Sequence, residues 1–524
     1  MGNKKIGLFI SIVVLVLALF GCSNDQTSQS SEKNSETGGE VNEGILEIAI
    51  PAQPPTLDPH LSTVTATRDI SRHIYETLVA FDENYEPVPM LAESIETSED
   101  GKTYTFHLRT GIKFHNGKEM TAEDVVASME RWKEKSTSAH AILQESTFSS
   151  TDNDTVVLQL EQPSILVLSA LANTSQFAAV MPKEVIDSAP ATGVEEYIGT
   201  GPFQFGEWNK DQNIKLTKYN EYQSVDLPTS GVSGKKEVFV SDVNFVFVPD
   251  NSTRLAGIQT GQYHVADTMS KDDYKQLSSN PDVNLVAPYG GFLSLVFNKK
   301  QGLFTDIKMR QAINAGVDMD SLLKGSLVEE YRANSSYILQ EKTQWFSEAG
   351  GENYNQNDPE KSKGLLGEAG YNGEEITILT TRDYLEGYNA AVIIKEQLEK
   401  IGMNIKVEAV DWATVVSSRE DPEKWDLLIT GFPTVSTPVE LLFFNEGFYD
   451  GPEDEKTAEL LQSIKNANSI DESKVFWDEL QAYSWEFLPI VKIGDYTQLL
   501  ASINKVEGVT FFDGPVLWNT KLTK

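Results

Sequence analysis

The clearest regularity in the chain is an alternation of short apolar runs with segments whose apolar residues recur every three to four positions. The segment 388–402 is a predicted helix whose apolar residues share one face: Ala391, Ile394, Leu398 and Ile401. Around it the pattern predicts strands at 376–381, 403–410 and 425–430, and a short helix at 412–418 capped by Asp411. Strands separated by amphipathic helices favour βαβ units, so we expect an α/β fold with a largely parallel sheet here.

The N-terminal half of the folded chain carries weaker patterns. An apolar strand is predicted at 44–51, and the segment 102–118 is typical of a hairpin because it contains the turn dipeptide Asn116-Gly117. A helix is expected at 121–133, with Thr121 as its cap and Asp124 three residues later in place of the usual Glu. No period of 20 to 50 residues recurs, which argues against a solenoid or propeller.

The first 22 residues follow a different pattern. Lys4 and Lys5 precede an apolar run at 6–21, which is short for a membrane span and matches the layout of a secretory signal. The run ends at Gly21-Cys22, which resembles the cleavage site of a bacterial lipoprotein, with Cys22 as the lipidated residue. The alternative is an uncleaved anchor with an incidental cysteine. Because Cys22 is the only cysteine of the chain, no disulfide can form within it.

Composition supports a large folded protein behind this signal. The 524 residues include 40% hydrophobic residues, 24 Phe, 18 Tyr and 8 Trp, enough for about three domains with their own cores. The segment 22–43 is polar and rich in Ser, Asn, Gln, Thr and Glu, which indicates a flexible tether. With 78 acidic against 43 basic residues the net charge is -35, which makes nucleic acid an improbable partner. Attachment to a membrane would therefore depend on the lipid at Cys22.

The search for catalytic and cofactor motifs is negative. The chain has no G-x-x-x-x-G-K-[ST], H-E-x-x-H or G-x-S-x-G sequence, and its six histidines are scattered without the spacing of metal ligands. We therefore expect no metal, no cofactor and no enzymatic activity. A tethered, acidic α/β protein without catalytic motifs suggests the capture of a solute outside the cell.

A set of short motifs makes this suggestion specific. Together they resemble extracellular solute-binding protein family 5 (peptide/nickel-type), the oligopeptide- and dipeptide-binding lipoproteins of ABC importers. They cover nearly the whole mature body in the family's order: Pro55-Thr56-Leu57-Asp58-Pro59, Ile74-Tyr75-Glu76-Thr77-Leu78, Gly111-Ile112-Lys113-Phe114-His115-Asn116-Gly117, Gly199-Thr200-Gly201-Pro202-Phe203, Arg254-Leu255-Ala256-Gly257 and Met309-Arg310-Gln311-Ala312-Ile313-Asn314.

The resemblance implies a fold of the type II periplasmic-binding-protein class, with two lobes, an extra domain and a hinged cleft. It places domain I at 44–75, 197–285 and 490–524, the extra domain II at 76–196, and domain III, the second lobe, at 286–489. It implies a monomer. The long Ser- and Glu-rich tether behind Cys22 fits anchoring on the outer face of the cell membrane of a single-membrane bacterium. Short peptides captured there would pass to the transmembrane subunits of an ABC permease, whose ATPase subunits lie on the far side.

Ligand contacts follow from the resemblance only in part. In dipeptide-binding relatives an arginine after the strand matching 376–381 pairs with the ligand carboxylate, and Arg382 occupies that place. The acid that holds the ligand amine in many relatives is missing from 433–438, and Asp411 or Glu440 could replace it. Further candidates are aromatic residues for a cleft wall and two threonines for its floor: Trp412, Phe432, Tyr384, Tyr388, Thr63 and Thr65.

Three classes of function remain open at this point. The leading one is the binding protein of an ABC peptide importer, whose ligand could also be a glutathione-like compound, a metal chelate or an oligosaccharide. A secreted hydrolase would need a catalytic constellation that the sequence does not show. A sensor that reports peptides without transporting them would share the same ligand cleft.

Overall fold

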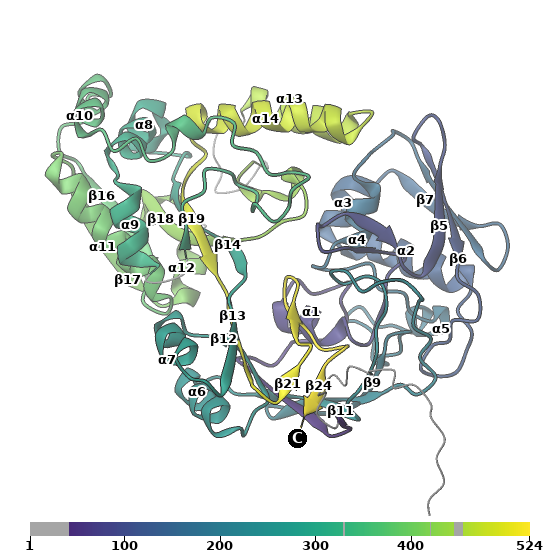
Figure 1. The fold of residues 1–524 in the computed structure, drawn as a ribbon. Coiled ribbons are helices and arrows are strands. Elements are labelled where there is room, and N and C mark those ends of the chain that lie inside the picture. The colour runs from purple at the N-terminus through teal and green to yellow at the C-terminus, as the bar shows by residue number, and fades with distance from the viewer. Residues whose placement is uncertain (1–40, 328–330, 420, 445–453, 524) are drawn as a thin grey trace, which may run out of the picture. The chain divides into compact units, whose positions relative to one another are not determined.

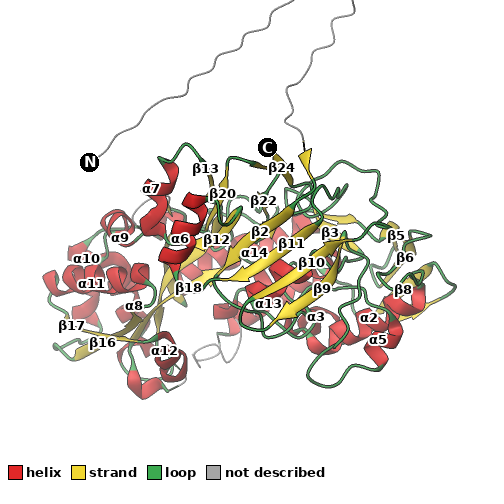
Figure 2. Ribbon diagram, turned by 90° about the horizontal axis from the view of Figure 1, so that it is seen from below, coloured by secondary structure: helices red, strands yellow, loops and turns green. Residues whose placement is uncertain are grey.

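The computed structural model describes residues 41–327, 331–419, 421–444 and 454–523 (Figure 1). Within these ranges the predicted strand at 44–51 is confirmed as β2, which lies near the middle of a seven-stranded sheet. Figure 2 shows β12, β2, β11, β10 and β9 side by side. In sheet order the strands are β13 (Val283–Val286), β20 (Leu499–Ile503), β12 (Val265–Met269), β2 (Ile45–Ile50), β11 (Asp242–Phe247), β10 (Asn213–Lys218) and β9 (Phe203–Asn209).

A six-stranded sheet contains the strands predicted in the C-terminal half. In sheet order these are β15 (Tyr331–Arg332), β19 (Ile490–Thr497), β14 (Tyr289–Phe297), β18 (Leu427–Pro433), β16 (Glu375–Thr381) and β17 (Asn404–Val410). β16 pairs in parallel with β17 and β18, as the βαβ pattern predicts. The expectation of a largely parallel sheet is wrong, because β14 pairs antiparallel with both of its neighbours.

The helices of this region follow the predicted pattern closely. α11 (Leu385–Lys400) begins three residues before the expected start and packs against β16, β17 and β18. Its predicted apolar face is buried in the core of the six-stranded sheet, as Ala391, Ile394, Leu398 and Ile401 show. α12 (Trp412–Ser418) begins after Asp411, whose carboxylate accepts the backbone N–H of Thr414 at 3.0 Å.

A four-stranded antiparallel sheet forms the core of the segment predicted as the extra domain. It consists of β5 (Ala92–Thr97), β6 (Thr103–Leu108), β8 (Thr155–Leu160) and β7 (Ser146–Ser150). The predicted hairpin at 102–118 is wrong as a unit, because β6 pairs with β5 and β8. A tight turn does form at Asn116-Gly117, but it closes only an isolated bridge between Lys113 and Glu119. The predicted capping box of Thr121 and Asp124 opens α2 (Ala122–Lys135).

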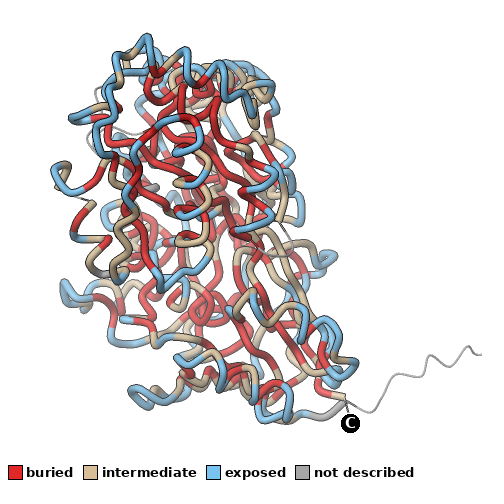
Figure 3. The backbone as a smooth tube through the Cα atoms, turned by 90° about the vertical axis from the view of Figure 1, so that its left-hand side faces the viewer, coloured by how far each residue is buried: buried red, intermediate tan, exposed pale blue. Residues whose placement is uncertain are grey.

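The other helices and the short strands connect and cover these sheets, and Figure 3 shows buried positions concentrated inside and exposed positions mostly at outer turns. The helices are α1 (Thr65–Ser71), α3 (Thr137–Leu143), α4 (Val167–Ala172), α5 (Lys183–Asp187), α6 (Asn251–Thr260), α7 (Tyr274–Ser278), α8 (Ile307–Gly316), α9 (Met319–Ser326), α10 (Pro359–Glu368), α13 (Glu455–Asn466) and α14 (Ile470–Phe487). The short strands are β1 (Val41–Asn42), β3 (Val79–Phe81), β4 (Pro87–Pro89), β21 (Val506–Glu507), β22 (Thr510–Phe511), β23 (Pro515–Val516) and β24 (Lys521–Thr523).

The chain passes from the seven-stranded to the six-stranded sheet between β13 and β14 and returns between β19 and β20 (Figure 1). The two passages lie side by side, and the backbone N–H of Gln498 donates to the carbonyl of Pro288 at 2.9 Å. Gly290 permits this approach, since a Cβ there would lie 2.6 Å from the Gln498 side chain. β19, whose residues we assigned to domain I, belongs to the six-stranded sheet, so the return passage lies after Thr497 and not at 490.

A buried ion pair connects the segment before α1 to α2. Asp58 is fully buried and accepts two hydrogen bonds from the guanidinium of Arg131 and one from the backbone N–H of Val194 at 3.0 Å. Burial alone would raise the pKa of Asp58, but the bonds from Arg131 and its positive charge outweigh burial and lower the pKa below 3.8. The ionised carboxylate is therefore favoured in the folded protein.

We expect Asp58→Asn to lower the free energy of unfolding by about 3 kcal/mol, because it leaves the buried Arg131 without its counter-charge. Urea denaturation at neutral pH measures the change. The pKa of Asp58 is lower in the folded than in the unfolded chain, so its stabilisation is present above the unfolded pKa and disappears as the pH falls through the folded one. The difference between the two proteins should shrink accordingly in acid.

Asp187→Asn is the matched control, since it removes a carboxylate that pairs with Lys183 on the exposed surface of α5. It should change stability by less than about 1 kcal/mol. Equal effects of the two substitutions would show that the Asp58 ion pair does not stabilise this part of the fold.

Candidate functional site

A cavity of about 600 Å³ lies between residues of the seven-stranded and six-stranded sheets. It is placed where β12 and β16 end and beside the middle of β18, and in open α/β sheets the carboxyl ends of strands are where ligands bind. The passage from β19 to β20 also borders it, through the residues 496–499. The cavity is therefore built on the only pair of passages that we find between the two sheets in the described ranges.

Aromatic side chains form part of the cavity wall. Tyr496 stands over two glycines of neighbouring strands, Gly291 and Gly431, and a Cβ on Gly291 would lie 2.7 Å from its hydroxyl oxygen. The rings of Tyr384 and Trp412 meet nearly edge to face, with centroids 5.4 Å apart. These aromatic rings can make apolar contacts with a ligand and cation–π interactions with a positively charged group.

An ion pair crosses the cavity. The Nζ atom of Lys271, which follows β12, lies 3.4 Å from a carboxylate oxygen of Glu386 in the first turn of α11. The same Nζ lies 4.5 Å from the ring centroid of Tyr496. Burial lowers the pKa of Lys271, and Glu386 opposes this only in part. The pair joins residues attached to different sheets at the ligand cavity.

The second cation of the wall, Arg254, has a structural role. Its guanidinium donates to the carbonyls of Val248 at 2.7 Å, Pro249 at 3.0 Å and Thr268 at 2.9 Å, and the residue is buried. These bonds fix the end of β12 against the start of α6, which sets the position of Lys271 two residues later. Arg254 therefore shapes the cavity through the backbone.

Two buried threonines line the cavity with unsatisfied hydroxyl groups. Thr380 is 0% exposed and Thr497 is 2% exposed. Among the described residues, neither hydroxyl has a hydrogen-bond partner. Because a buried polar group without a partner costs free energy, these two hydroxyls are suited to bind a polar group inside the cavity.

A separate polar contact joins the six-stranded region to the rest of the molecule. The Nζ of Lys342 lies 3.8 Å from a carboxylate oxygen of Asp513 and 3.9 Å from the ring centroid of Tyr85. Asp513 also accepts hydrogen bonds from the hydroxyls of Tyr85 at 2.9 Å and Thr174 at 2.8 Å. Burial would raise the pKa of Asp513, but Lys342 and the other partners lower it, so the carboxylate stays ionised.

The structure brings two of the predicted ligand residues, Tyr384 and Trp412, into the cavity wall. Arg382 directly follows the wall residue Thr381, but its side chain is exposed and its guanidinium lies 4.9 Å from the ring centroid of Tyr388. Neither Arg382 nor Tyr388 lines the cavity. Their roles in binding stay predictions.

The remaining candidates lie elsewhere. Phe432 is buried in an aromatic cluster, where its ring stacks on Phe292 with centroids 5.5 Å apart. Thr63 and Thr65 are exposed just before and at the start of α1 and are not part of the cavity wall. Cys22, with the signal and tether, lies outside the described residues.

The two acids suggested as replacements for the missing one are both engaged in local bonds. Glu440 accepts from the Thr437 hydroxyl at 2.8 Å and from the side-chain amide of Asn173 at 2.9 Å, and burial raises its pKa. Asp411 caps α12 through Thr414. Neither is among the cavity residues.

Sequence reasoning did not find the polar residues that the cavity brings together: Lys271, Glu386, Thr380, Thr497 and Tyr496. They come from four separate segments of the chain, and no local motif links them. Arg254, which also lines the cavity, lies in a motif that carries the family resemblance.

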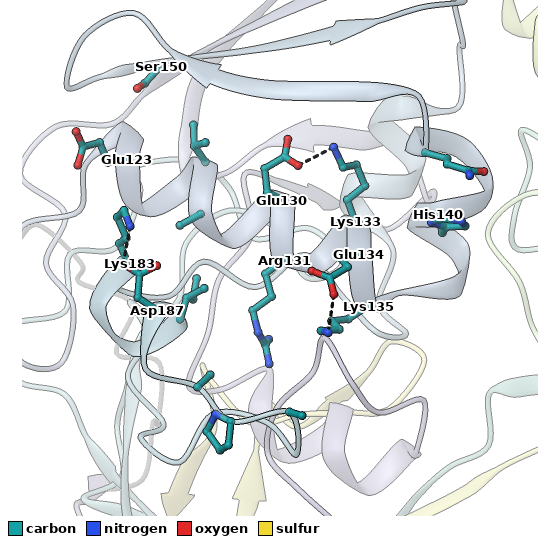
Figure 4. Close-up of a pocket in the computed structure, with 17 residues that line it drawn as sticks. Glu123, Glu130, Arg131, Lys133, Glu134, Lys135, His140, Ser150, Lys183 and Asp187 are labelled. Carbon is teal, nitrogen blue, oxygen red and sulfur yellow. Dashed lines mark hydrogen bonds and ion pairs between the residues drawn. The ribbon is translucent and has the colours of Figure 1, made fainter.

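Figure 4 shows a second, larger pocket of about 800 Å³ beside α2 and α5. Arg131 pairs with the buried Asp58, whereas three further ion pairs of the wall join neighbours on the same helix: Lys133 with Glu130, Lys135 with Glu134 and Lys183 with Asp187. Such pairs are typical of a solvated surface. We assign the ligand to the cavity between the sheets, where unsatisfied buried hydroxyls and a pair from two different sheets meet.

Two searches of the described ranges gave negative results. No helix there combines the length and apolar character that crossing a membrane requires. No group of three or more His, Cys, Asp or Glu side chains there is arranged to hold a metal ion.

Comparison with known proteins gives consistent matches. Residues 86–451 match the family described as bacterial extracellular solute-binding proteins, family 5 Middle. The chain is 29% identical to a probable peptide ABC transporter periplasmic-binding protein, y4tO of Sinorhizobium fredii, over 88% of this chain and 90% of the relative. It is 31% identical to the dipeptide-binding protein of Escherichia coli, over 71% of this chain and 72% of the relative.

Among solved structures, the binding protein AgaA from A. tumefacien R10, in complex with agropinic acid, aligns with a TM-score of 0.75 and 26% identity. The alignment covers 92% of this chain and 99% of that one. The expected type II periplasmic-binding-protein fold is thereby confirmed. With most of its length matched, the chain belongs to the bacterial extracellular solute-binding proteins of family 5.

Proposed function

We propose that this protein captures short peptides outside the cell and delivers them to the transmembrane subunits of an ABC importer. The observation that carries the proposal is the cavity between the two sheets. Its volume of about 600 Å³ lies within the range of ~300–1,000 Å³ that is usual for small-ligand sites. It offers aromatic faces, both signs of charge and unsatisfied hydroxyls, which suits a small zwitterion with side chains.

The relatives support a peptide as the first choice of ligand. y4tO and the Escherichia coli protein are both named for peptides. AgaA was solved with agropinic acid, so a non-peptide solute is the second candidate within the same role. We propose no catalytic role and a monomeric protein. The three-domain division stays part of the proposal, with the boundary after Thr497.

Native mass spectrometry of the tethered domain, residues 23–524, tests the ligand class. We expect short peptides to be released on denaturation, because a cleft that closes over its ligand retains it during purification. Release of a single non-peptide compound would change the proposed ligand class and leave the proposed role in transport unchanged. If the protein carries nothing and binds no peptide added to it, the peptide proposal is wrong.

Transport and sensing are separated by a second experiment. Deletion of the gene should abolish uptake of the peptides identified above, because the permease depends on its binding protein for delivery. Unchanged uptake would favour a sensor with the same cavity.

Arg382 remains our candidate for the ligand carboxylate, because it directly follows the cavity residue Thr381 and its side chain is exposed. Arg382→Ala should weaken binding of the identified peptide by about 2 kcal/mol, the usual contribution of a charged hydrogen bond. Titration calorimetry measures this. Lys400→Ala, which removes an exposed cation at the other end of α11, is the control and should leave affinity unchanged.

We also propose that Cys22 is lipidated and that residues 22–43 form the tether to the outer face of the membrane. Cys22→Ser should release the protein into the medium, because each acyl chain contributes ~0.8 kcal/mol per buried methylene to membrane attachment. Cell fractionation followed by immunoblotting measures the distribution. Retention of the variant in the membrane fraction would show that the apolar run at 6–21 can hold the protein there without a lipid, as in the alternative of an uncleaved anchor.

A further inference from the structure

A peptide ligand carries a positive charge at its amino end, and the binding cavity must provide a negative charge to receive it. A peptide presents a primary ammonium group, and the loop 433–438 contains no carboxylate to receive it. A buried ammonium without a counter-charge is costly, so a ligand of this class needs an acid elsewhere in the cavity.

Three carboxylates are among the residues that line the cavity: Asp272, Asp383 and Glu386. Asp272 and Asp383 are exposed, and Asp383 is occupied by the backbone N–H of Trp412 at 2.8 Å. Glu386 is half-buried and belongs to the first turn of α11, where the positive end of the helix dipole stabilises an ionised carboxylate. Glu386 is therefore the best-placed acid for a cation inside the cavity.

The group that Glu386 already binds is a primary ammonium group, that of Lys271. The Lys271 Nζ has Glu386 on one side at 3.4 Å and the Tyr496 ring on another, with the centroid at 4.5 Å. A carboxylate together with an aromatic face is a suitable environment for a cation. The Thr380 hydroxyl, also in the cavity wall, lies 3.5 Å from the position that a Cβ on Gly387, the residue after Glu386, would take.

The ion pair between Lys271 and Glu386 is longer than the ion pairs on the exposed side of α11. On the exposed side of α11, Lys395–Glu399 and Lys400–Glu396 are separated by 2.8 and 2.9 Å, whereas Lys271 and Glu386 are 3.4 Å apart. Burial disfavours the charged form of Lys271 and lowers its pKa. Lys271 has a long flexible side chain, so it can leave while the helix and its carboxylate stay in place.

We propose that Glu386 is the carboxylate that receives the ammonium group of the ligand, and that Lys271 occupies this place until the ligand displaces it. The proposal rests on the proposed peptide function and names one subsite within it. No covalent step is involved. The ligand ammonium takes the position of the Lys271 ammonium, between Glu386 and Tyr496.

The test uses a synthetic pool of lysine-free peptides of two to five residues, and the same pool with N-acetylated or N-methylated amino ends. Acetylation removes the positive charge, whereas methylation keeps it. Binding to the full tethered domain is measured by native mass spectrometry and titration calorimetry for the wild type and for Glu386→Gln, Lys271→Met and Glu399→Gln.

The wild type should bind the free and the methylated pools at least about tenfold more tightly than the acetylated one, because only the first two keep the charge for a buried ionic contact. Glu386→Gln should lose about tenfold for the charged pools and nothing for the acetylated pool. Lys271→Met should bind the charged pools several-fold more tightly, since the internal competitor is gone. Glu399→Gln, which removes an exposed acid from the same helix, should behave as the wild type.

The outcomes separate this proposal from the function on which it rests. A wild type that binds peptides but does not distinguish the acetylated pool overturns ammonium recognition and leaves the peptide function standing. Equal losses for all pools in Glu386→Gln and in Lys271→Met would identify the ion pair as a contact that holds the two sheets together, which overturns the exchange. A wild type that binds no pool overturns both.

Discussion

The cavity depends on the hydrogen-bonded contact between the two chain passages that connect the large sheets. Because Gln498 donates to Pro288, the passages behave as one two-stranded ribbon and not as two independent linkers. The glycine at position 290 is what lets them approach. Residues on either side of this ribbon, such as Met269 and Tyr496, then face one another across the cavity.

Charge is distributed in this protein in two different ways. The chain is strongly acidic, with a net charge of -35, which favours solubility and repels anionic surfaces. Several buried charges, in contrast, are paired, as in Asp58 with Arg131, Asp513 with Lys342 and Asp495 with Lys492. Such pairs stabilise little compared with apolar packing but fix which segments lie together. Lys342 and Asp513 join the six-stranded region to the C-terminal segment in this way.

Sequence patterns predicted well those parts of the fold that depend on contacts between residues close in the sequence. The face of α11, the cap at Asp411 and the capping box at Thr121 all depend on residues within one or two turns, and the structure has them as expected. Failures came where pairing partners are distant. β6 joins β5 and β8 rather than the turn at Asn116-Gly117, and β19 pairs with β14 across about 200 residues of intervening chain. Periodicity carries no information on such partners.

The candidate site was less predictable for the same reason. Tyr384 and Trp412 were found because they flank predicted elements, whereas Lys271 and Glu386 are ordinary surface-type residues in sequence and meet only through the arrangement of the two sheets. The composition gave no signal for Glu386 either, because one acid does not stand out among 78 acidic residues.

An internal cation at the binding carboxylate has a consequence for selectivity in so acidic a protein. The field of the surface attracts every small cation, and an unpaired carboxylate in the cavity would bind them without discrimination. Lys271 neutralises Glu386, so a small cation that displaces the Lys271 ammonium group gains little binding free energy. A ligand must add contacts that Lys271 does not make, on the rings of Tyr384 and Trp412 or the hydroxyls of Thr380 and Thr497. Selectivity then comes from competition between the ligand and Lys271 for Glu386. A small cation does not displace Lys271, whereas a ligand whose ammonium group is joined to groups that fit the cavity wall does.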